Sequence, residues 1–331
     1  MNKVFNWGII GPGKIAHKFA QDIQKLPNAR LHAVASRSLE RAQAFAETYQ
    51  AKHAFGAYHE IVNCPDLDVV YIATPHTGHL ENTLLCLRHQ IPVLCEKPLA
   101  VNLRQVQRMI LAAQQSQTFL MEAIWTRFIP THLKMWELIK QGAIGKVLSV
   151  KADFGFKANF NPEGRLFNKA LAGGSLLDIG IYPVFLAMNV FGKPDEILAT
   201  GHIGPTGVDE EVGILFKYKE GQTAHLHSTI RSNTKTEAFI YGETGTIYLH
   251  SRWHEPSTMS LLQTGKAPVY FNFAYETHGY SYEAVEVMQC LEDGKIESDH
   301  LPLQFSADLM DVLFSIRHQI GLVYREDQKI D

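Results

Sequence analysis

The chain has 331 residues, 46% of them hydrophobic, and its 31 Lys and Arg residues nearly balance 34 Asp and Glu residues, for a net charge of −3. A chain of this length usually forms two domains of about 100–200 residues, and this apolar fraction excludes an intrinsically disordered protein. The balanced charge and the lack of a basic block argue against nucleic acid or an anionic membrane as partner and favour a small molecule.

The four cysteines, Cys64, Cys86, Cys95 and Cys290, are widely spaced and form no C-x-x-C pair. This spacing argues against a disulfide framework or a zinc ribbon and is typical of a reducing compartment. The first residues lack the cleavage site of a signal peptide, and no stretch approaches 18 apolar residues. We therefore expect a soluble cytoplasmic protein with no membrane partner.

Short apolar runs alternate with helical patterns through the first third of the chain, as in a parallel sheet built of βαβ units. Six strands are expected at about residues 4–10, 31–35, 53–55, 69–73, 93–95 and 119–122, with helices at about 15–25, 39–49, 58–62, 80–89 and 103–116. Six strands are the count of a doubly wound α/β fold, so we predict an N-terminal Rossmann domain over residues 1–122.

Beyond residue 122 the pattern becomes that of an α+β domain, which we place at residues 123–331. Helices are expected at about 131–140, 175–190, 282–293 and 306–321, a strand at 147–156, and further strands joined by turns between 197 and 262. Alternating residues in Thr223–Thr229 indicate a sheet with one polar face. A large, mainly antiparallel open sheet is therefore predicted, with a last helix that could pack back on the first domain.

The sequence GPGKIA at residues 11–16 lies between the first predicted strand and the first helix. In that context G-x-G-x-x-A indicates a dinucleotide site, because the glycines make a tight turn and let the backbone approach a pyrophosphate at the helix N-terminus. A glycine turn with no ligand is the alternative. The residues expected to contact a cofactor here are Gly11, Pro12, Gly13, Lys14 and Ile15.

The end of the second strand bears on the choice of cofactor. Folds that bind NAD normally carry an acid at this position, whereas this chain has Ser36, Arg37 and Ser38, followed by Arg41. A guanidinium binds a 2′-phosphate that a carboxylate would repel, and the hydroxyls can add donors. NADP(H) is therefore predicted over NAD(H), although Arg37 could be a solvated arginine in an enzyme that accepts both.

Two further strand ends carry polar groups. Ligands collect at the carboxyl ends of parallel strands, so we expect cofactor contacts from residues after the fourth and fifth strands. These residues are Thr74, Pro75, His76, His79, Glu96 and Lys97. A salt-bridged strand end is the alternative for Glu96 and Lys97. Neither the pair His76 and His79 nor the pair His225 and His227 has a carboxylate or thiolate to complete a ligand set, so no metal site is predicted.

A glycine-rich segment opens the apolar helix of the second domain. Asp178 and Tyr182 are four residues apart and so share one helix face, while Gly174 and Gly180 would let a bulky group approach. A charged and a phenolic side chain on an otherwise apolar face indicate a binding site. The alternative is a capping Asp and a core Tyr.

Three motifs together resemble the Gfo/Idh/MocA oxidoreductase superfamily over essentially the whole chain. They are Gly11-x-Gly13-x-x-Ala16, Glu96-Lys97-Pro98 and Gly173-Gly174-x-x-x-Asp178-x-Gly180-x-Tyr182. The segment MEAIWTRF at residues 121–128 and the tyrosine at position 182 also resemble the dimeric dihydrodiol dehydrogenase branch, which includes NADP-dependent D-xylose dehydrogenases. Inositol dehydrogenases, by contrast, carry histidine where this chain has Tyr182.

The resemblance implies an NADP(H)-dependent oxidoreductase that moves a hydride between nicotinamide C4 and a sugar hemiacetal, a vicinal diol or the matching carbonyl. It makes Lys97 and Tyr182 the proton-transfer pair and has Asp178 bind a substrate hydroxyl. Trp125 and Phe154 would supply an apolar wall for the substrate, and Arg127 would contact the cofactor. It also implies a homodimer formed through the C-terminal sheet.

Three other functions stay open on the sequence alone. They are an NADPH-binding regulatory protein without turnover, an inositol or other polyol dehydrogenase of the same superfamily, and an enzyme that cleaves glycosidic bonds through transient oxidation with tightly held NAD. Either Lys97 or Tyr182 could be the formal base, because the two would titrate as a coupled pair.

Overall fold

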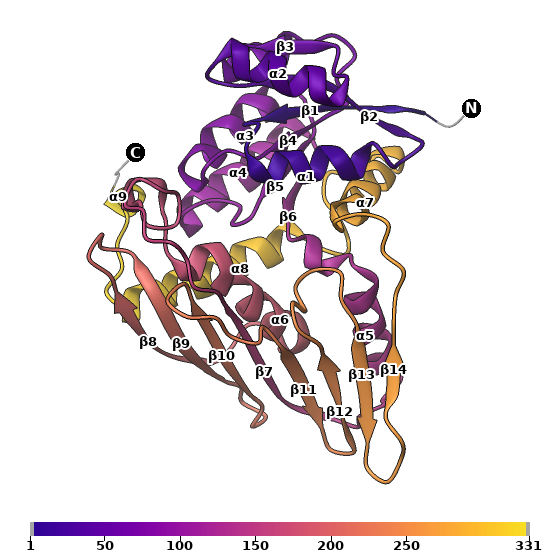
Figure 1. The fold of residues 1–331 in the computed structure, drawn as a ribbon, viewed down its shortest axis with the longest axis vertical. Helices are drawn as coiled ribbons and strands as arrows, with labels where there is room; N and C mark the ends of the chain where they lie inside the picture. Colours follow the sequence, from indigo (N-terminus) through magenta and orange to yellow (C-terminus); the bar gives the residue numbers. More distant parts are fainter. Residues whose placement is uncertain (1–2, 329–331) are drawn as a thin grey trace. The chain divides into compact units, whose positions relative to one another are not determined.

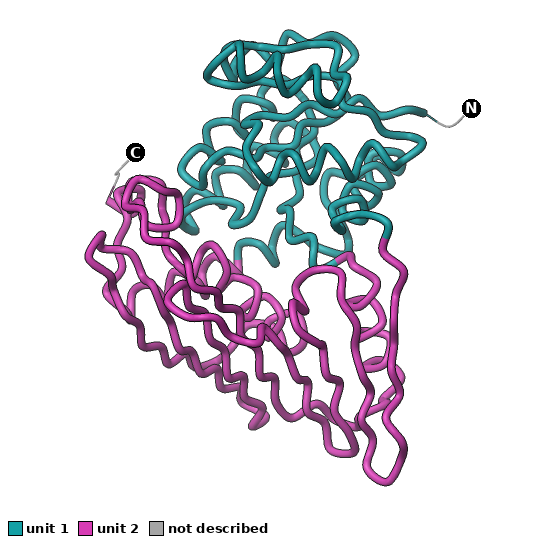
Figure 2. Tube along the Cα trace, in the orientation of Figure 1, with its two compact units in different colours: residues 1–127, 276–307 teal, residues 128–275, 308–331 magenta. Residues whose placement is uncertain are grey.

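The computed structural model describes residues 3–328 (Figure 1). Its contacts group the chain into two compact units, coloured in Figure 2. The first comprises Met1–Arg127 and Glu276–Ala307, and the second comprises Phe128–Tyr275 and Asp308–Asp331. Each unit is therefore assembled from two segments that are distant in sequence.

The first unit is built on a six-stranded sheet in which every neighbouring pair is parallel. The strand order is β3-β2-β1-β4-β5-β6. The strands are β1 (Phe5–Ile10), β2 (Ala29–Ala35), β3 (His53–Phe55), β4 (Val69–Ile72), β5 (Val93–Glu96) and β6 (Leu120–Ala123). The order reverses direction between β1 and β4, which is where ligands bind in open α/β sheets.

Helices connect these strands as the apolar periodicity predicts. They are α1 (Lys14–Ile23), α2 (Leu39–Tyr49), α3 (His79–Arg88) and α4 (Leu103–Ser116), with short 3-10 turns η1 (Tyr58–Asn63), η2 (His76–Gly78) and η3 (Trp125–Arg127). Helix α1 packs on the sheet through Phe19, whose ring centroid lies 3.9 Å from that of Tyr71 on β4 and 5.2 Å from that of Trp7 on β1. All three side chains are fully buried, so they fix α1 over the centre of the sheet.

Helix α7 (Tyr280–Glu292) belongs to this unit although it lies far along the chain. It has no side-chain cap of its own. The buried carboxylate of Asp22 on α1 replaces that cap: Oδ1 accepts from the backbone N of His278 at 2.8 Å, and Oδ2 accepts from the N of Tyr280 at 2.7 Å. A carboxylate at a helix N-terminus satisfies amides that would otherwise have no partner, so Asp22 anchors α7 to α1.

The second unit contains an eight-stranded sheet of order β14-β13-β12-β11-β7-β10-β9-β8. Its strands are β7 (Val147–Gly155), β8 (Glu196–Ile203), β9 (Asp209–Lys217), β10 (Thr223–Thr229), β11 (Ala238–Gly242), β12 (Gly245–Leu249), β13 (Met259–Gln263) and β14 (Val269–Phe271). Only the pairing of β10 with β7 is parallel. On β10, Ala224 and Leu226 are buried and His225 is exposed, which confirms the predicted polar face.

The helices of this unit are α5 (Pro130–Lys140), α6 (Ile181–Phe191) and α9 (Arg325–Gln328), with a 3-10 turn η4 (Lys169–Leu171) and a π-helical turn η5 (Leu176–Gly180). Helix α8 (Leu303–Gln319) contributes residues to both units, because the first unit ends at Ala307. The helical stretch Lys169–Phe191 is long and apolar enough to cross a membrane, but 94% of its most apolar window is buried, as in a core helix.

The predicted fold class is confirmed: a doubly wound parallel sheet precedes an α+β part with a large, mainly antiparallel sheet. One local prediction needs correction. The helix expected at 175–190 is not uniformly α-helical, because its first turn, η5, is π-helical.

Candidate functional site

The phosphate loop has the backbone that the glycine motif requires. Gly11 has φ +88°, and a Cβ at this position would lie 3.0 Å from the backbone N of Thr74. A Cβ at Gly13, in contrast, would meet only the Gly11 carbonyl oxygen, at 4.0 Å. Gly11 is therefore needed for the turn, whereas Gly13 leaves space beside the backbone that a ligand could fill.

Helix α1 begins at this loop without a side-chain cap. Gly13 is its N-cap residue, and its first turn contains no acidic side chain. The first amides of a helix need a partner, and the helix dipole favours an anion there. This end of α1 therefore fits the pyrophosphate of a dinucleotide.

Thr74, which follows β4, lies directly beside this loop. Its side chain is 8% exposed, and its Oγ1 has no hydrogen-bond partner among residues 3–328. Buried hydroxyls are normally satisfied, so this atom fits a ligand that donates or accepts at the same edge of the sheet. Pro75 and the buried His76 follow it in the chain.

The segment after β2 presents its charges to solvent. Arg37 and Arg41 are exposed, and Arg37 has no ion-pair partner in the described part of the chain. The hydroxyl oxygens of Ser36 and Ser38 accept backbone N–H groups, from Ser38 and Arg41 respectively, each at 3.3 Å. The hydroxyl protons are therefore not used in these two bonds, and both serines can still donate to a phosphate.

Lys97 follows the last residue of β5, and the backbone around it is held by two buried carboxylates. Glu96 accepts from the Tyr71 hydroxyl and, at 3.2 Å, from the backbone N of Lys97. Beyond the cis Lys97–Pro98 bond, Glu122 accepts from the backbone N of Leu99 at 2.8 Å. Burial raises the pKa of Glu122 to about 7. These contacts fix the position from which the Lys97 side chain leaves the sheet.

His79 contacts the segments that follow β4 and β5. Its ring is fully buried, with Nδ1 2.9 Å from the Pro98 carbonyl oxygen and Nε2 3.0 Å from that of Thr74. Burial lowers the pKa of His79, against the two carbonyl contacts, which favour the charged ring. His79 therefore links the backbone of the segments that hold Thr74 and Lys97.

Trp125 and Arg127 lie on η3 at the end of the first segment. The Trp125 ring stacks on that of Tyr280 at 4.4 Å, with 5° between the ring planes. Arg127 donates from Nε to the carbonyl oxygen of His300 at 2.8 Å. Both side chains thus contact the C-terminal segment of the first unit.

In the second unit, Asp178 lies on the π-helical turn η5 and forms an ion pair with Arg165. Both terminal nitrogens of Arg165 face the carboxylate, and Asp178 is 9% exposed whereas Arg165 is 48% exposed. π-Helical turns occur frequently at functional sites. A substrate hydroxyl at Asp178 would therefore share this carboxylate with a guanidinium that the sequence analysis did not single out.

Tyr182 is the second residue of α6, and its ring belongs to an aromatic group. Its centroid lies 5.7 Å from that of Phe154 and 5.1 Å from that of His254, and the Phe154 and His254 rings stack at 3.9 Å. The structure thus brings together two residues predicted to contact substrate, Phe154 and Tyr182. His254 was missed because no spacing in the sequence links it to either of them.

Gly174 and Gly180, on either side of Asp178, are in contact with groups of the protein itself. Gly174 has φ +127°, and a Cβ there would overlap Oδ1 of Asp209, while a Cβ on Gly180 would lie 2.7 Å from Oγ of Ser228. The expectation that these glycines admit a bulky group is therefore corrected: what approaches them is Asp209 and Ser228 of the same unit. Asp209 was missed because it is one of three consecutive acids at the start of a strand.

Asp209 acts as a cap for the turn that holds Asp178. Its Oδ2 accepts from the Leu176 backbone N at 2.6 Å and from the Ser175 hydroxyl at 2.9 Å. Burial raises the pKa of this carboxyl from 3.8 to about 7, although the two hydrogen bonds oppose the shift. The folded state therefore keeps a proton that the unfolded chain releases.

The raised pKa of Asp209 makes the stability of the fold depend on pH. The free energy of unfolding should fall as the pH rises from about 4 to about 7, because over that range the folded state binds more protons than the unfolded state. Buried Glu122 and Glu283 act in the same direction. In Asp209→Asn the loss between about pH 5 and pH 8, measured by urea unfolding, should be smaller by on the order of 2–4 kcal/mol. Asp153→Asn is the control, because it changes a half-buried carboxylate that also accepts backbone amides. Its loss of unfolding free energy over this pH range should match that of the wild type. The same loss in Asp209→Asn, Asp153→Asn and the wild type would contradict the prediction.

Comparisons with known proteins agree with this architecture. Residues 5–124 match the model of an oxidoreductase family with an NAD-binding Rossmann fold, and residues 132–248 match the GFO/IDH/MocA C-terminal domain. The chain is 41% identical to trans-1,2-dihydrobenzene-1,2-diol dehydrogenase of Danio rerio, covering 98% of this chain and 99% of that one, and 36% identical to the Homo sapiens protein of that name over the same shares.

Solved structures share the fold at lower identity. Aldose-aldose oxidoreductase from Caulobacter crescentus has a TM-score of 0.87 at 24% identity, covering 96% of this chain and 98% of that one. A 3-ketoreductase from Actinomadura kijaniata, solved with NADP and TDP-benzene, has a TM-score of 0.84 at 24% identity over the same shares. The chain has a Rossmann sheet, matches both family models and has relatives at 36–41% identity over nearly its full length. It therefore belongs to the Gfo/Idh/MocA family of NAD(P)-dependent oxidoreductases.

Proposed function

We propose that this enzyme is an NADP(H)-dependent dehydrogenase or reductase acting on the CH–OH group of a vicinal diol or a sugar hemiacetal, or on the matching carbonyl. The observation that carries the proposal lies within the first unit. Gly11, Thr74 and Lys97 lie within two residues after the ends of three adjacent parallel strands, β1, β4 and β5. The phosphate loop, an unpartnered hydroxyl and an ammonium group therefore follow the carboxyl ends of neighbouring strands.

The first unit would hold the cofactor at two places. Gly11, Gly13 and the first amides of α1 would hold the pyrophosphate, and Thr74 would bind the nicotinamide half. When bound, the dinucleotide supplies a hydride acceptor or donor at nicotinamide C4. The chain itself must then hold the substrate oxygen and move its proton.

We assign those two tasks to Lys97 and Tyr182. The Lys97 ammonium would orient the substrate oxygen and, as a cation, favour the ionised phenol of Tyr182, whose ordinary pKa is about 10. Tyr182 Oη would take the hydroxyl proton on oxidation and return it on reduction. Asp178 would accept a hydrogen bond from a second hydroxyl, with Phe154 and Trp125 as apolar contacts for the ring.

The proposed substrate class rests on the relatives. Those at 36–41% identity over nearly the full chain are named for a ring with two adjacent hydroxyls. A carboxylate beside a phenol can bind two such hydroxyls, one at Asp178 and one at Tyr182, if both groups face the substrate. Trans-1,2-dihydrobenzene-1,2-diol, D-xylose and myo-inositol, each tested with NADP⁺ and NAD⁺, give the direct assay: turnover of the diol or the pentose supports the proposal, and NADPH binding with no turnover of any substrate contradicts it.

Arg37 provides the test of cofactor choice. Its loss removes a charge-assisted contact of about 1.5–3 kcal/mol, so Arg37→Ala should weaken NADPH binding about 10- to 100-fold and NADH binding less than about 3-fold. Nicotinamide fluorescence measures both affinities. Arg88→Ala, an exposed arginine on α3, should change neither. Equal losses for the two cofactors in Arg37→Ala would show that this residue does not recognise the 2′-phosphate.

We also propose a homodimer formed through the C-terminal sheet. The strand register places four exposed apolar side chains on one sheet face, Leu198, Tyr241, Leu262 and Tyr270. Phe239 and Tyr248 are paired on the same face, and their rings stack at 4.4 Å. An exposed sheet face with this many apolar and aromatic side chains is typical of an interaction surface. Solution scattering at micromolar concentration should give twice the 37.3 kDa chain mass, and Phe239→Lys should give the single-chain mass. A wild-type protein of 37.3 kDa in solution would contradict the proposal.

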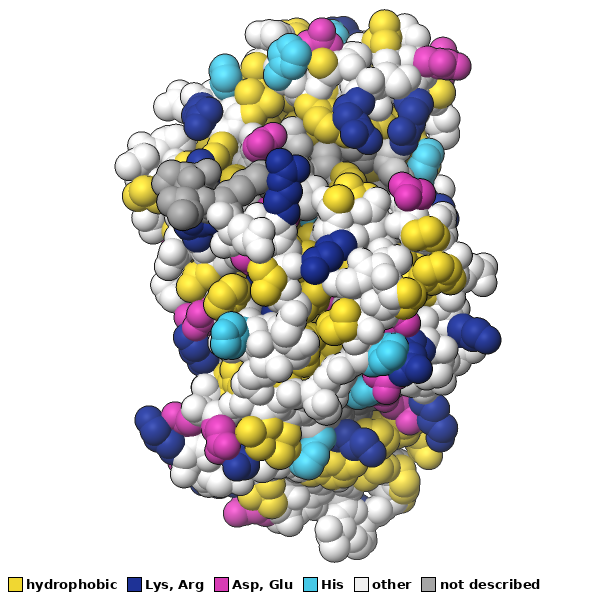
Figure 3. Space-filling model, turned by 90° about the vertical axis from the view of Figure 1, so that its left-hand side faces the viewer, with side chains coloured by type: hydrophobic (Ala, Val, Ile, Leu, Met, Phe, Trp, Pro, Cys, Tyr) yellow, Lys and Arg dark blue, Asp and Glu magenta, His cyan; other side chains and the backbone are white. Residues whose placement is uncertain are grey.

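A small substrate and a cytoplasmic setting complete the proposal. Basic and acidic side chains are intermingled on the face shown in Figure 3, in line with the net charge of −3. All four cysteines are buried and free, which supports a reducing compartment.

A further inference from the structure

His32 occupies an irregular position in the sheet of the first unit. Trp7 and Gly8 are consecutive in β1, yet they pair with Leu31 and Ala33 of β2, so His32 is an extra residue in β2. Such a β-bulge changes the direction in which a side chain points, and bulges are often tied to function. Its occurrence at a buried histidine prompts the question of what that side chain meets.

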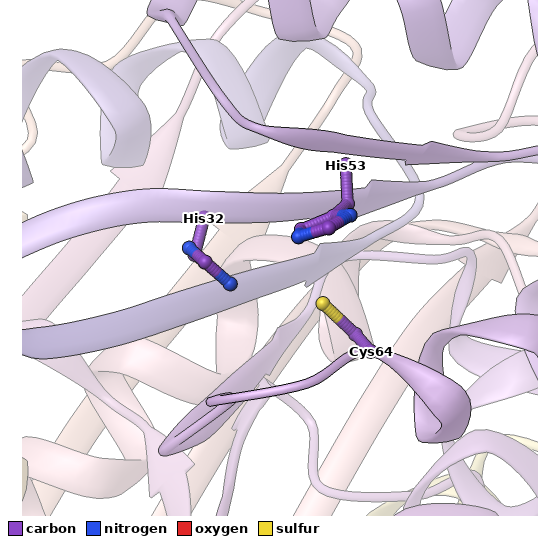
Figure 4. A group of neighbouring side chains, drawn as sticks. All are labelled: His32, His53 and Cys64. Carbon is purple, nitrogen blue, oxygen red and sulfur yellow. The ribbon is translucent and has the colours of Figure 1, made fainter.

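The side chain of His32 lies close to two other side chains of types that can bind a metal ion. His53 is the first residue of β3, and Cys64 follows the 3-10 turn η1. Figure 4 shows the three side chains directed toward a common space, and one ligating atom from each lies within 4.8 Å of the other two. The two histidine rings make an edge contact at 4.9 Å. Three separate elements thus supply two imidazoles and a thiol to one place inside a single unit.

The hydrogen bonds around this group are incomplete. Nε2 of His53 is buried and has no partner among the described residues. Within residues 3–328, the single hydrogen-bond contact of the Cys64 thiol is a long one, 3.6 Å, to the Pro65 carbonyl oxygen. His32, in contrast, has Nε2 3.0 Å from that same oxygen. A carbonyl partner on one ring nitrogen is the usual way in which a metal-binding histidine is oriented.

We propose that His32, His53 and Cys64 form a Zn²⁺ site, which the sequence analysis did not anticipate. Two imidazoles and a thiolate are a donor set that suits zinc, with a water as fourth ligand. Zn–N bonds of about 2.1 Å and Zn–S bonds of about 2.3 Å place tetrahedral ligand atoms roughly 3.4–3.7 Å apart. The group therefore has to contract by about 1 Å, which side-chain rotation at the partly exposed edge residue His53 allows.

The site would have a structural role. It would join β2, the three-residue edge strand β3 and the segment after η1, none of which is joined by a disulfide. His32 lies four residues before Ser36, about 13 Å along the strand, so the ion would not touch the cofactor residues. The proposal is therefore independent of the proposed function, and bound zinc should raise the melting temperature in the absence of nucleotide.

Cobalt(II) gives the sharpest test, because a thiolate–cobalt bond has a near-ultraviolet charge-transfer band that histidine-only sites lack. The metal-stripped full-length protein should develop this band with one equivalent of Co²⁺, and one equivalent of Zn²⁺ should remove it. Cys64→Ser should abolish the band and lower the Zn²⁺ affinity, measured by competition with a chromogenic chelator, at least about 100-fold. Cys290→Ser, which changes another buried cysteine, should leave both unchanged.

His53→Gln provides a second variant in case Cys64→Ser does not fold, as judged by circular dichroism. It keeps the thiolate but loses one imidazole, so the band should weaken and the Zn²⁺ affinity should fall at least about 10-fold. Absence of the band in the wild type, its persistence in Cys64→Ser, or its loss in Cys290→Ser would each overturn the proposal. In those cases the three side chains are a packed core group without a ligand.

Discussion

Lys97→Met is expected to lower kcat by a factor of about 10³ or more while changing the Kd for NADPH less than about 3-fold. Methionine keeps the length and apolar character of the lysine stem but removes the ammonium group that the proposal places at the substrate oxygen. In the proposal the cofactor is held mainly elsewhere, at the α1 N-terminus and by Arg37, so its affinity should change little. Steady-state oxidation of the diol, followed by NADPH absorbance, and NADPH fluorescence titration measure the two quantities.

Lys18→Met is the matched control, because it removes an exposed lysine on α1 that has no part in the proposed chemistry. Its kcat should equal that of the wild type. A second comparison separates a shared proton-transfer step from two independent roles: if Lys97 and Tyr182 act as a unit, the variant carrying both Lys97→Met and Tyr182→Phe should be about as slow as the slower single variant. An unchanged kcat in Lys97→Met would remove this residue from the mechanism.

Gly174→Ala is expected to lower the free energy of unfolding by more than about 4 kcal/mol. Two costs add at this position. A φ of +127° is a conformation that residues with a Cβ rarely adopt, and the new methyl group would overlap Oδ1 of Asp209 and lie 3.0 Å from its Cγ. The Asp209 carboxylate cannot easily move, because it is buried and bonded to Ser175 and Leu176. Urea unfolding of the purified variant measures the loss.

Gly221→Ala separates the two costs. Gly221 also has a positive φ, +87°, but a Cβ there would meet nothing within 4 Å, so its replacement should cost only about 1 kcal/mol. In an Asp209→Ala background, Gly174→Ala should cost less than it does in the wild type, because the overlapping carboxylate is gone. Similar losses in Gly174→Ala and Gly221→Ala would show that the approach of Asp209 is not what requires glycine.

Local pattern was enough to predict most of the fold. Continuous apolar runs such as Val69–Ile72 are typical of strands covered on both faces, and glycine and proline mark the turns between elements. The glycine turn before α1 could be predicted because its motif lies within six consecutive residues. The bulge at His32 and the π-helical turn at Asp178 could not, because each depends on how neighbouring elements pack rather than on local periodicity.

Most of the residues that the sequence motifs group into a candidate site are close in sequence. Glu96 and Lys97 are adjacent at a strand end, and Asp178 and Tyr182 are four residues apart. Long-range contacts gave no signal, so the ion pair of Asp178 with Arg165 and the ring contacts of Tyr182 with His254 were missed. The same holds for the carboxylate that caps the turn of Asp178, which comes from a later strand.

The hydrogen bonds between the Asp22 carboxylate and the start of α7 bear on the order in which the chain can fold during synthesis. A ribosome delivers residues 1–127 first, yet Asp22 then has none of the amides of His278, Tyr280 and Ser281 that accompany its burial. An unpaired carboxylate resists removal from water, so α1 cannot complete its packing at that stage. The nucleotide-binding half should therefore become resistant to protease only after residue 307 has emerged, even though its sheet is complete by residue 123.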